Sequence, residues 1–171
     1  MAKTGFYIII LSLVVPSALF AQEPSAPFSA SSNLSSQIDF KFMYYHDILE
    51  NAPHSPKRSL ALFANAEYYF LNHDYIHAEE YFKKYLTEAK NSNGHLFAYF
   101  YLWQIAKSNH DQKGISYWSE KIITFQQQVF IFRDKREITF HSPLNRAHRA
   151  VCRVDRIEFN IAGKVADEII Y

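Results

Sequence analysis

Apolar positions recur along residues 61–86 with the period of a helix, stop at a polar triplet and then resume. The triplet is Asn72-His73-Asp74, and the pattern on its two sides predicts two short amphipathic helices. Asn and His tolerate the left-handed backbone of helix ends, and Asp74 is placed to accept a backbone N–H of the next helix. Neither helix is long enough to be stable alone, so we expect their apolar faces to pack together. The positions that set the period are Leu62, Ala66, Tyr69, Phe70, Tyr75, Ala78, Tyr81, Phe82, Tyr85 and Leu86.

The same pattern returns further along the chain. A constant shift in numbering lays the triplet Asn72-His73-Asp74 onto Asn109-His110-Asp111, and it lays Phe63 onto Phe100. The repeat predicts a second helix pair, over residues 95–106 and 113–127. The first helix of that pair is apolar on almost every side, so we expect it to be buried at the centre of the bundle.

These residues resemble a tetratricopeptide repeat over about residues 59–127. That family forms helix-turn-helix units of about 34 residues, with small residues where the paired helices meet. The resemblance is carried by Ala61, Leu62, Ala66, Tyr68, Tyr69, Asp74, Tyr75, Ala78, Phe82 and Leu86. It implies a protein or peptide partner, bound in a groove lined by the first helix of each pair. The groove residues it implies are Phe63, Glu67, Phe70, Phe100, Gln104 and Lys107.

A helical pattern also precedes the first pair. It starts at about Ser36 and ends before Pro53, and we expect this helix to cover the open end of the first repeat. The helical region is therefore predicted to span residues 37–128.

The period changes to two after Gln128, which indicates strands over residues 129–171. Residues 129–132 and 137–140 are predicted as two strands joined at a charged turn. Alternation continues from Ala150 to Ile161, and Ala162-Gly163-Lys164 predicts a turn into a last strand. We expect a small antiparallel sheet of three or four strands whose apolar face packs on the helices. The predicted fold class is α+β. If this tail packs over the groove residues, they belong to the core instead of forming a binding site for a partner.

The first residues have the three-part pattern of a secretory signal peptide. Lys3 precedes an apolar run from Phe6 to Val15, and small residues end at Ala21. The run is about ten residues long, whereas a membrane span needs about twenty. We expect residues 1–21 to be a cleaved signal, residues 22–36 a disordered spacer, and the mature chain to be periplasmic or secreted without a membrane span.

Charge and cysteine content exclude some classes of protein. The formal net charge of +1 gives no electrostatic reason to bind nucleic acid, and Cys152, the single cysteine, excludes an internal disulfide. The eight histidines do not show the His-Glu-x-x-His spacing of a zinc site, and no phosphate-binding glycine loop is present. We therefore expect no metal, no cofactor and no catalytic residues.

Two features of the tail leave alternatives open. Basic residues outnumber acidic ones between Arg133 and Arg156, which fits either a surface for an acidic partner or the solvated face of a sheet. The loop around Ser142, with His141 and His148 on its flanks, allows a small exported hydrolase or carbohydrate-binding protein. The leading hypothesis is a non-enzymatic scaffold or protein-interaction module, part of a cell-envelope or secreted assembly.

Overall fold

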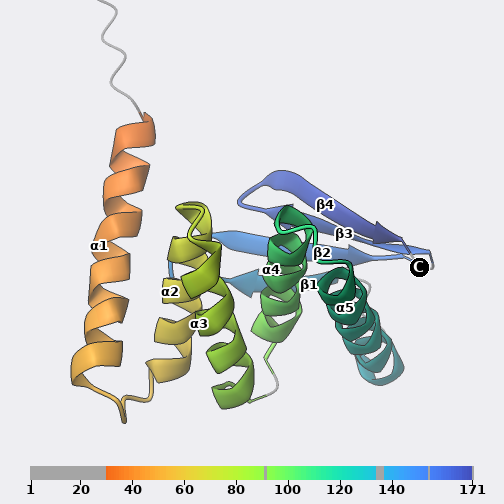
Figure 1. The fold of residues 1–171 in the computed structure, drawn as a ribbon, viewed down its shortest axis with the longest axis horizontal. Coiled ribbons are helices and arrows are strands. Elements are labelled where there is room, and N and C mark those ends of the chain that lie inside the picture. The colour runs from red at the N-terminus through yellow and green to blue at the C-terminus, as the bar shows by residue number, and fades with distance from the viewer. Residues whose placement is uncertain (1–29, 91, 134–136, 154, 171) are drawn as a thin grey trace, which may run out of the picture.

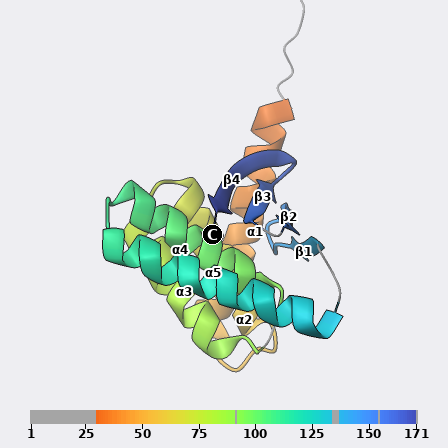
Figure 2. The same cartoon turned by 90° about the vertical axis from the view of Figure 1, so that its right-hand side faces the viewer.

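A computed structural model describes residues 30–90, 92–133, 137–153 and 155–170. The predicted signal peptide and the first part of the predicted spacer lie outside the described residues. Within this part of the chain the elements are α1 (Ala30–Asn51), α2 (Arg58–Leu71), α3 (Tyr75–Glu88), α4 (Gly94–Ser108), α5 (Gln112–Arg133), β1 (Glu137–His141), β2 (Ala147–Cys152), β3 (Arg156–Ile161) and β4 (Lys164–Ile170). The helices stand side by side in chain order, and the sheet runs across one side of them (Figure 1). The second view shows the helices and the sheet as two layers (Figure 2), and the predicted α+β class is confirmed.

The helices α2 to α5 form two hairpins with the same turn. His73 and His110 both adopt the left-handed backbone, with φ of 61° and 54°. Each donates its backbone N–H to the carbonyl three residues earlier, on Phe70 and Lys107, at 3.0 and 3.1 Å. The Asp74 side chain accepts the N–H of residue 77 at 3.3 Å and caps α3. The predicted helix pairs, their turn residues and this cap are confirmed.

The first helix packs where the sequence pattern predicted. α1 contacts α2, and Phe42 stacks on Tyr68 with ring centroids 3.8 Å apart. However, α1 begins at Ala30 rather than near Ser36, so the prediction of a disordered spacer is wrong for residues 30–36. Once an apolar segment has nucleated a helix, each further residue adds a hydrogen bond at little cost, so α1 extends back through Ser36 to Ala30.

The predicted strand over residues 129–132 is also wrong. These residues continue α5, which ends at Arg133, so the boundary between the helical and strand regions moves beyond residue 128. A short apolar run carries no period of its own and fits a helix as well as a strand. Propagation of the existing helix decides the outcome, because each added residue gains a hydrogen bond within the same segment.

The sheet is an antiparallel meander in the order β1-β2-β3-β4. Cross-strand neighbours on its inner face include Ile138, Ala150 and Phe159, which are paired in register. The predicted turn into the last strand is confirmed, since Ala162 and Gly163 have φ of 52° and 80°, as a tight two-residue hairpin requires.

The inner face of the sheet packs on the first helix of each pair. Phe159 of β3 stacks on Phe100 of α4 with ring centroids 4.1 Å apart, and Phe140 of β1 meets Phe63 of α2 at 4.8 Å. Most of α4 is buried between the sheet and its neighbouring helices, as its apolar sequence predicted. The expected packing of the tail on the helices is therefore confirmed, and it decides what lies over the predicted groove.

None of the described helices combines the length and apolar character needed to cross a bilayer.

Candidate functional site

The groove residues implied by the resemblance lie on the helix face that the sheet covers. Phe63, Glu67 and Phe100 have essentially no exposed surface. Gln104 and Lys107 lie nearer the edge, where both contact the carboxylate of Asp167 on β4, at 3.1 and 2.5 Å. The chain's own tail thus occupies the face that the resemblance assigns to a partner. Phe70, the remaining groove residue, borders a cavity at one end of that face.

A buried cluster of Glu67, Tyr101, Arg146 and His148 joins the helices to the sheet. The Tyr101 hydroxyl donates to Glu67 Oε1 at 2.9 Å, and His148 Nε2 lies 3.1 Å from the same oxygen. Arg146 Nε is 3.3 Å from it, so three groups converge on one carboxylate oxygen. Glu67 Oε2 is buried without a hydrogen-bond partner among the described residues. Sequence reasoning selected Glu67 only as a groove position, and it did not select Tyr101.

The ring of His148 is fixed from both sides. Its Nδ1 lies 2.8 Å from the Arg146 carbonyl oxygen, which can only accept, so Nδ1 carries a proton. Its Nε2 lies 2.9 Å from the Tyr101 hydroxyl. Burial raises the pKa of the Tyr101 phenol well above its usual range, and the nearby Glu67 carboxylate raises it further. The hydroxyl therefore stays protonated and acts as the donor within the cluster.

The side chains around Ser142 are not arranged as the alternative hypothesis of a hydrolase requires. Ser142 Oγ accepts the backbone N–H of Arg146 at 3.2 Å, and no hydrogen bond joins it to a histidine in the part of the chain that the structure describes. Both ring nitrogens of His148 are already engaged, and His141 points to solvent on the edge strand. A nucleophile paired with a base is the arrangement that such chemistry needs.

A cavity of about 290 Å³ remains at one end of the helix–sheet interface, and we call it the end cavity. Its helix side is formed by Phe70, Phe100, Tyr101 and Gln104. Its sheet side is formed by Arg146, Ile161, Lys164 and Ala166. A β-bulge in the β3–β4 pairing leaves Ala166 without a cross-strand partner, which bends β4 beside the cavity.

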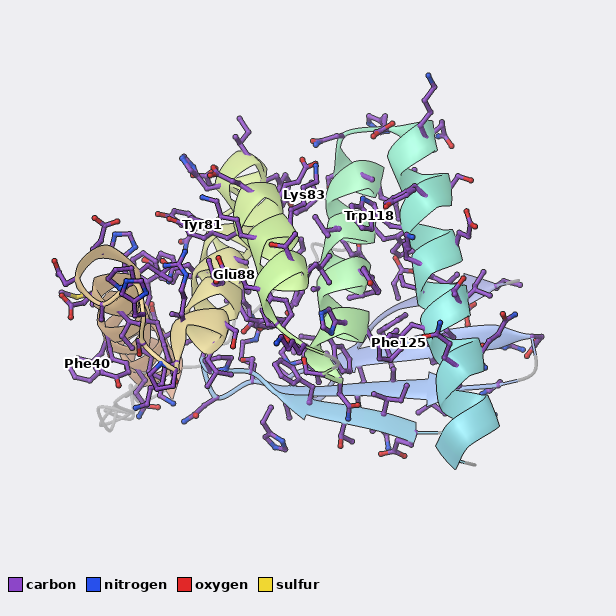
Figure 3. All side chains as sticks on the ribbon, turned by 90° about the horizontal axis from the view of Figure 1, so that it is seen from below. Phe40, Tyr81, Lys83, Glu88, Trp118 and Phe125 are labelled. Carbon is purple, nitrogen blue, oxygen red and sulfur yellow. The ribbon has the colours of Figure 1, made fainter. Side chains whose placement is uncertain are left out.

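A larger groove of about 660 Å³ lies on the side of the helices away from the sheet. We call it the outer groove, and Lys83 of α3 and Trp118 of α5 mark its two walls in Figure 3. Tyr99 of α4 lies between them and stacks on Trp118 with centroids 6.0 Å apart, while Tyr117 meets Trp118 edge-on at 4.7 Å. Because a Cβ on Gly114 would lie 3.0 Å from that of Ala106, the glycine allows α5 to pack closely on α4.

The charges of the outer groove are only partly compensated. Lys83 forms an ion pair with Glu79 at 2.5 Å. Lys121 lies over the Tyr117 ring, 5.2 Å from its centroid, and neither Lys121 nor Lys113 has a carboxylate partner among the described residues. Asp111 also lines the groove and accepts the backbone N–H of Lys113 at 3.1 Å. The groove therefore combines aromatic rings with two ammonium groups outside any ion pair and one further carboxylate, an excess of one positive charge.

Among the described residues, the basic side chains on the outer face of the sheet are paired with carboxylates. On the outer face of the sheet Arg149 lies 3.7 Å from Glu137, and Arg156 lies 3.5 Å from Glu168. Arg153 pairs with Glu158 at 2.8 Å. These alternating pairs fit the solvated face of an antiparallel sheet rather than a basic patch.

Among the described residues no group of histidine, cysteine, aspartate or glutamate side chains is arranged to hold a metal ion. No protein-family model, no curated protein and no solved structure matches this chain.

Proposed function

We propose that this chain is an exported, non-enzymatic interaction module that binds an acidic segment of a partner protein in the outer groove. The proposal keeps the function implied by the tetratricopeptide resemblance and moves its surface, because the sheet covers the inner face of α2 and α4. The observation that carries it is that three aromatic rings line the same groove as two lysines without carboxylate partners in the described chain. The rings are Tyr99, Tyr117 and Trp118, and the lysines are Lys113 and Lys121. Export rests on the signal-like pattern of the first residues.

The occupant follows from charge and shape. Lys113 and Lys121 lie on one wall, so acidic side chains of a partner would find two ammonium groups that need no displacement of an existing ion pair. The exposed ring of Tyr117 and the half-buried ring of Trp118 offer apolar area for a neighbouring side chain. Aromatic anchors beside charged rims are typical of sites where a few residues supply most of the binding energy.

Fluorescence anisotropy with two labelled peptides tests the proposal. One peptide alternates Glu with Leu, and the other carries Lys in place of every Glu. We expect the acidic peptide to bind about tenfold more tightly than the basic one, and added salt to weaken its binding. Equal binding of the two peptides would overturn the proposal.

Matched variants locate the surface. Changing Lys113→Glu together with Lys121→Glu should weaken binding of the acidic peptide about tenfold, because two attractive contacts become repulsive. Lys90→Glu makes the same change on an exposed residue outside the groove and should leave binding unaltered. Tyr117→Ala should weaken binding, whereas Ile76→Ala, which truncates a more exposed side chain on α3, should not. If the groove variants and the controls bind alike, another surface is responsible.

A further inference from the structure

Arg146 lines the end cavity, and Glu67, which does not line it, holds the arginine side chain in place. Arg146 Nε faces Glu67 Oε1 at 3.3 Å, and the side chain is only 18% exposed. Its backbone is fixed as well, since Arg146 N–H donates to Ser142 Oγ at 3.2 Å and its carbonyl accepts from Ser142 N–H at 2.9 Å. A side chain held at both ends loses little conformational freedom when it binds a ligand.

The outer edge of this guanidinium is not used within the part of the chain that the structure describes. No described residue forms a hydrogen bond with its Nη groups, and Arg146 lines the end cavity. Glu67 does not line the cavity, so its carboxylate lies behind the arginine rather than beside a ligand. Because Arg146 lines the cavity, its Nη groups are the donors available to a ligand there, and a guanidinium can bind a carboxylate through two parallel hydrogen bonds.

The charges around the cavity leave an excess of one positive group. Arg146 and Glu67 compensate each other, and Lys107 and Asp167 form a second pair at 2.5 Å. Lys164, at the start of β4, lines the cavity and has no ion-pair partner among the described residues. An anion that enters would therefore meet the guanidinium edge and one uncompensated ammonium group.

The remaining walls are apolar except for Gln104, whose amide donates to Asp167 at 3.1 Å. Phe70, Phe100 and Tyr101 contribute rings from the helices, and Ile161 contributes its side chain from β3. The volume of about 290 Å³ lies at the lower end of the range of about 300–1,000 Å³ that small-molecule sites occupy. It fits a single ring with a short side chain, rather than a sugar chain or a nucleotide.

We propose that the end cavity binds a small organic acid, with its carboxylate on Arg146 and Lys164 and its apolar body against the partly exposed ring of Phe70. This site is separate from the outer groove and does not depend on the function proposed for it. The geometry also assigns a role to the buried cluster, since Tyr101 and His148 hold Glu67 and Glu67 in turn orients the guanidinium.

Isothermal titration with 3-phenylpropionate, its neutral amide and inorganic phosphate tests the ligand class. We expect the acid to bind about tenfold more tightly than the amide, because only the acid can pair with the guanidinium edge. Phosphate should bind more weakly than the acid, since it makes no use of the apolar walls. Equal binding of acid and amide, phosphate binding as tightly as the acid, or no binding of the acid at its solubility limit would each overturn the proposal.

Variants chosen to preserve the fold locate the site. Arg146→Lys keeps a positive partner for Glu67 but removes the fork, and it should weaken binding of the acid about tenfold. Lys164→Gln alters an exposed side chain and should weaken it about two- to fivefold. Lys90→Gln is the control and should have no effect. Melting temperatures of the ligand-free variants show that each is folded, and unchanged affinity in a folded Arg146→Lys chain would refute the site. The Lys113→Glu, Lys121→Glu chain should bind the acid normally, so a failure of the outer groove is distinguishable from a failure here.

Discussion

Replacing Glu67 with alanine removes the acceptor at the centre of the buried cluster. In the parent, Glu67 Oε1 is approached by Tyr101, His148 and Arg146 within 3.3 Å, and the carboxylate has no exposed surface. The variant leaves Arg146, whose side chain is only 18% exposed, without its carboxylate partner, and it leaves an unfilled volume in the core. These losses come from one substitution on α2, far in sequence from the strand residues that lose their partner.

The expected loss in the free energy of unfolding is about 3–5 kcal/mol, the range seen when one partner of a buried ion pair is removed. Several terms contribute to it. A hydrogen bond to a charged group contributes about 1.5–3 kcal/mol, and the missing side chain adds a cavity cost. For a chain of this size, about 2–4 °C of melting temperature accompany each kcal/mol, so the melting temperature should fall by about 6–20 °C.

A double variant, Glu67→Met with Arg146→Met, separates an uncompensated charge from a general loss of packing. In that chain the Tyr101 hydroxyl can donate to His148 Nε2, which already lies 2.9 Å away, so neither polar group needs the carboxylate. Because apolar side chains of similar volume replace both charges, stability should return to within about 1–2 kcal/mol of the parent.

Urea denaturation followed by far-UV circular dichroism measures all the chains under the same conditions. Two outcomes would refute the reasoning. One is a Glu67→Ala chain within about 1 kcal/mol of the parent, a change typical of ordinary surface positions rather than buried charges. The other is a double variant whose loss equals the sum of the losses in Glu67→Met and Arg146→Met measured separately, because that additivity would mean that the two residues are not coupled.

Three further changes test other parts of the structure. Phe159→Ala should lower the free energy of unfolding by about 3–5 kcal/mol, because the Phe159 ring is buried 4.1 Å from that of Phe100. Val165→Ala, at an exposed position, should lower it by less than about 0.5 kcal/mol, and equal losses would contradict the packing of the sheet on α4. His73→Gly should stabilise the chain by about 0.5–1 kcal/mol, because φ at this turn is 61°, and a loss of stability in urea denaturation would argue against that backbone. Burial raises the pKa of the Cys152 thiol from 9.0 to about 11, so the folded chain keeps a proton that the unfolded chain releases. The protonated thiol therefore stabilises the folded chain fully below about pH 9, and this contribution is lost as the pH rises toward 11, by about 1.4 kcal/mol per pH unit. The urea midpoint of Cys152→Ala should fall less steeply with pH than that of the parent, and the same pH dependence in both chains would count against burial of the thiol.

The sequence predicted the parts of the fold that depend on neighbours along the chain. The period of three to four residues located α2 to α5, and the repeated Asn-His-Asp triplet located both turns, where the backbone does become left-handed at His73 and His110. Alternation located β1 and the start of β4 for the same reason, since each side chain needs only its own strand to define its face. It continued without a break from Ala150 to Ile161, however, and so missed the reversal between β2 and β3. The other errors fell at Ala30 and at residues 129–132, where helix propagation outweighs composition.

The candidate sites were less accessible to sequence reasoning. Helix spacing selected Glu67 as a groove position. Its contacts, however, come from α4, the β1–β2 loop and β2, and residue spacing along the sequence does not show that these three segments lie close together in space. The outer groove depends on how far α3 and α5 lie apart across Tyr99, which is set by packing of the whole bundle. The order of the strands placed the sheet over α2 and α4, and the period alone could not choose between a filled groove and an open one.

The chain order of the elements has a consequence for synthesis on the ribosome. Each helix packs on the next one in sequence, and each strand pairs with the next strand, so these contacts can form as the chain emerges. The contacts of the sheet with α2 and α4 have to wait for the last residues. At about 5–20 residues per second, the aromatic face that includes Phe63 and Phe100 stays uncovered for several seconds after α4 has been made. During that interval the nascent chain presents the kind of apolar surface that chaperones bind, and this surface is buried once β3 packs on α4.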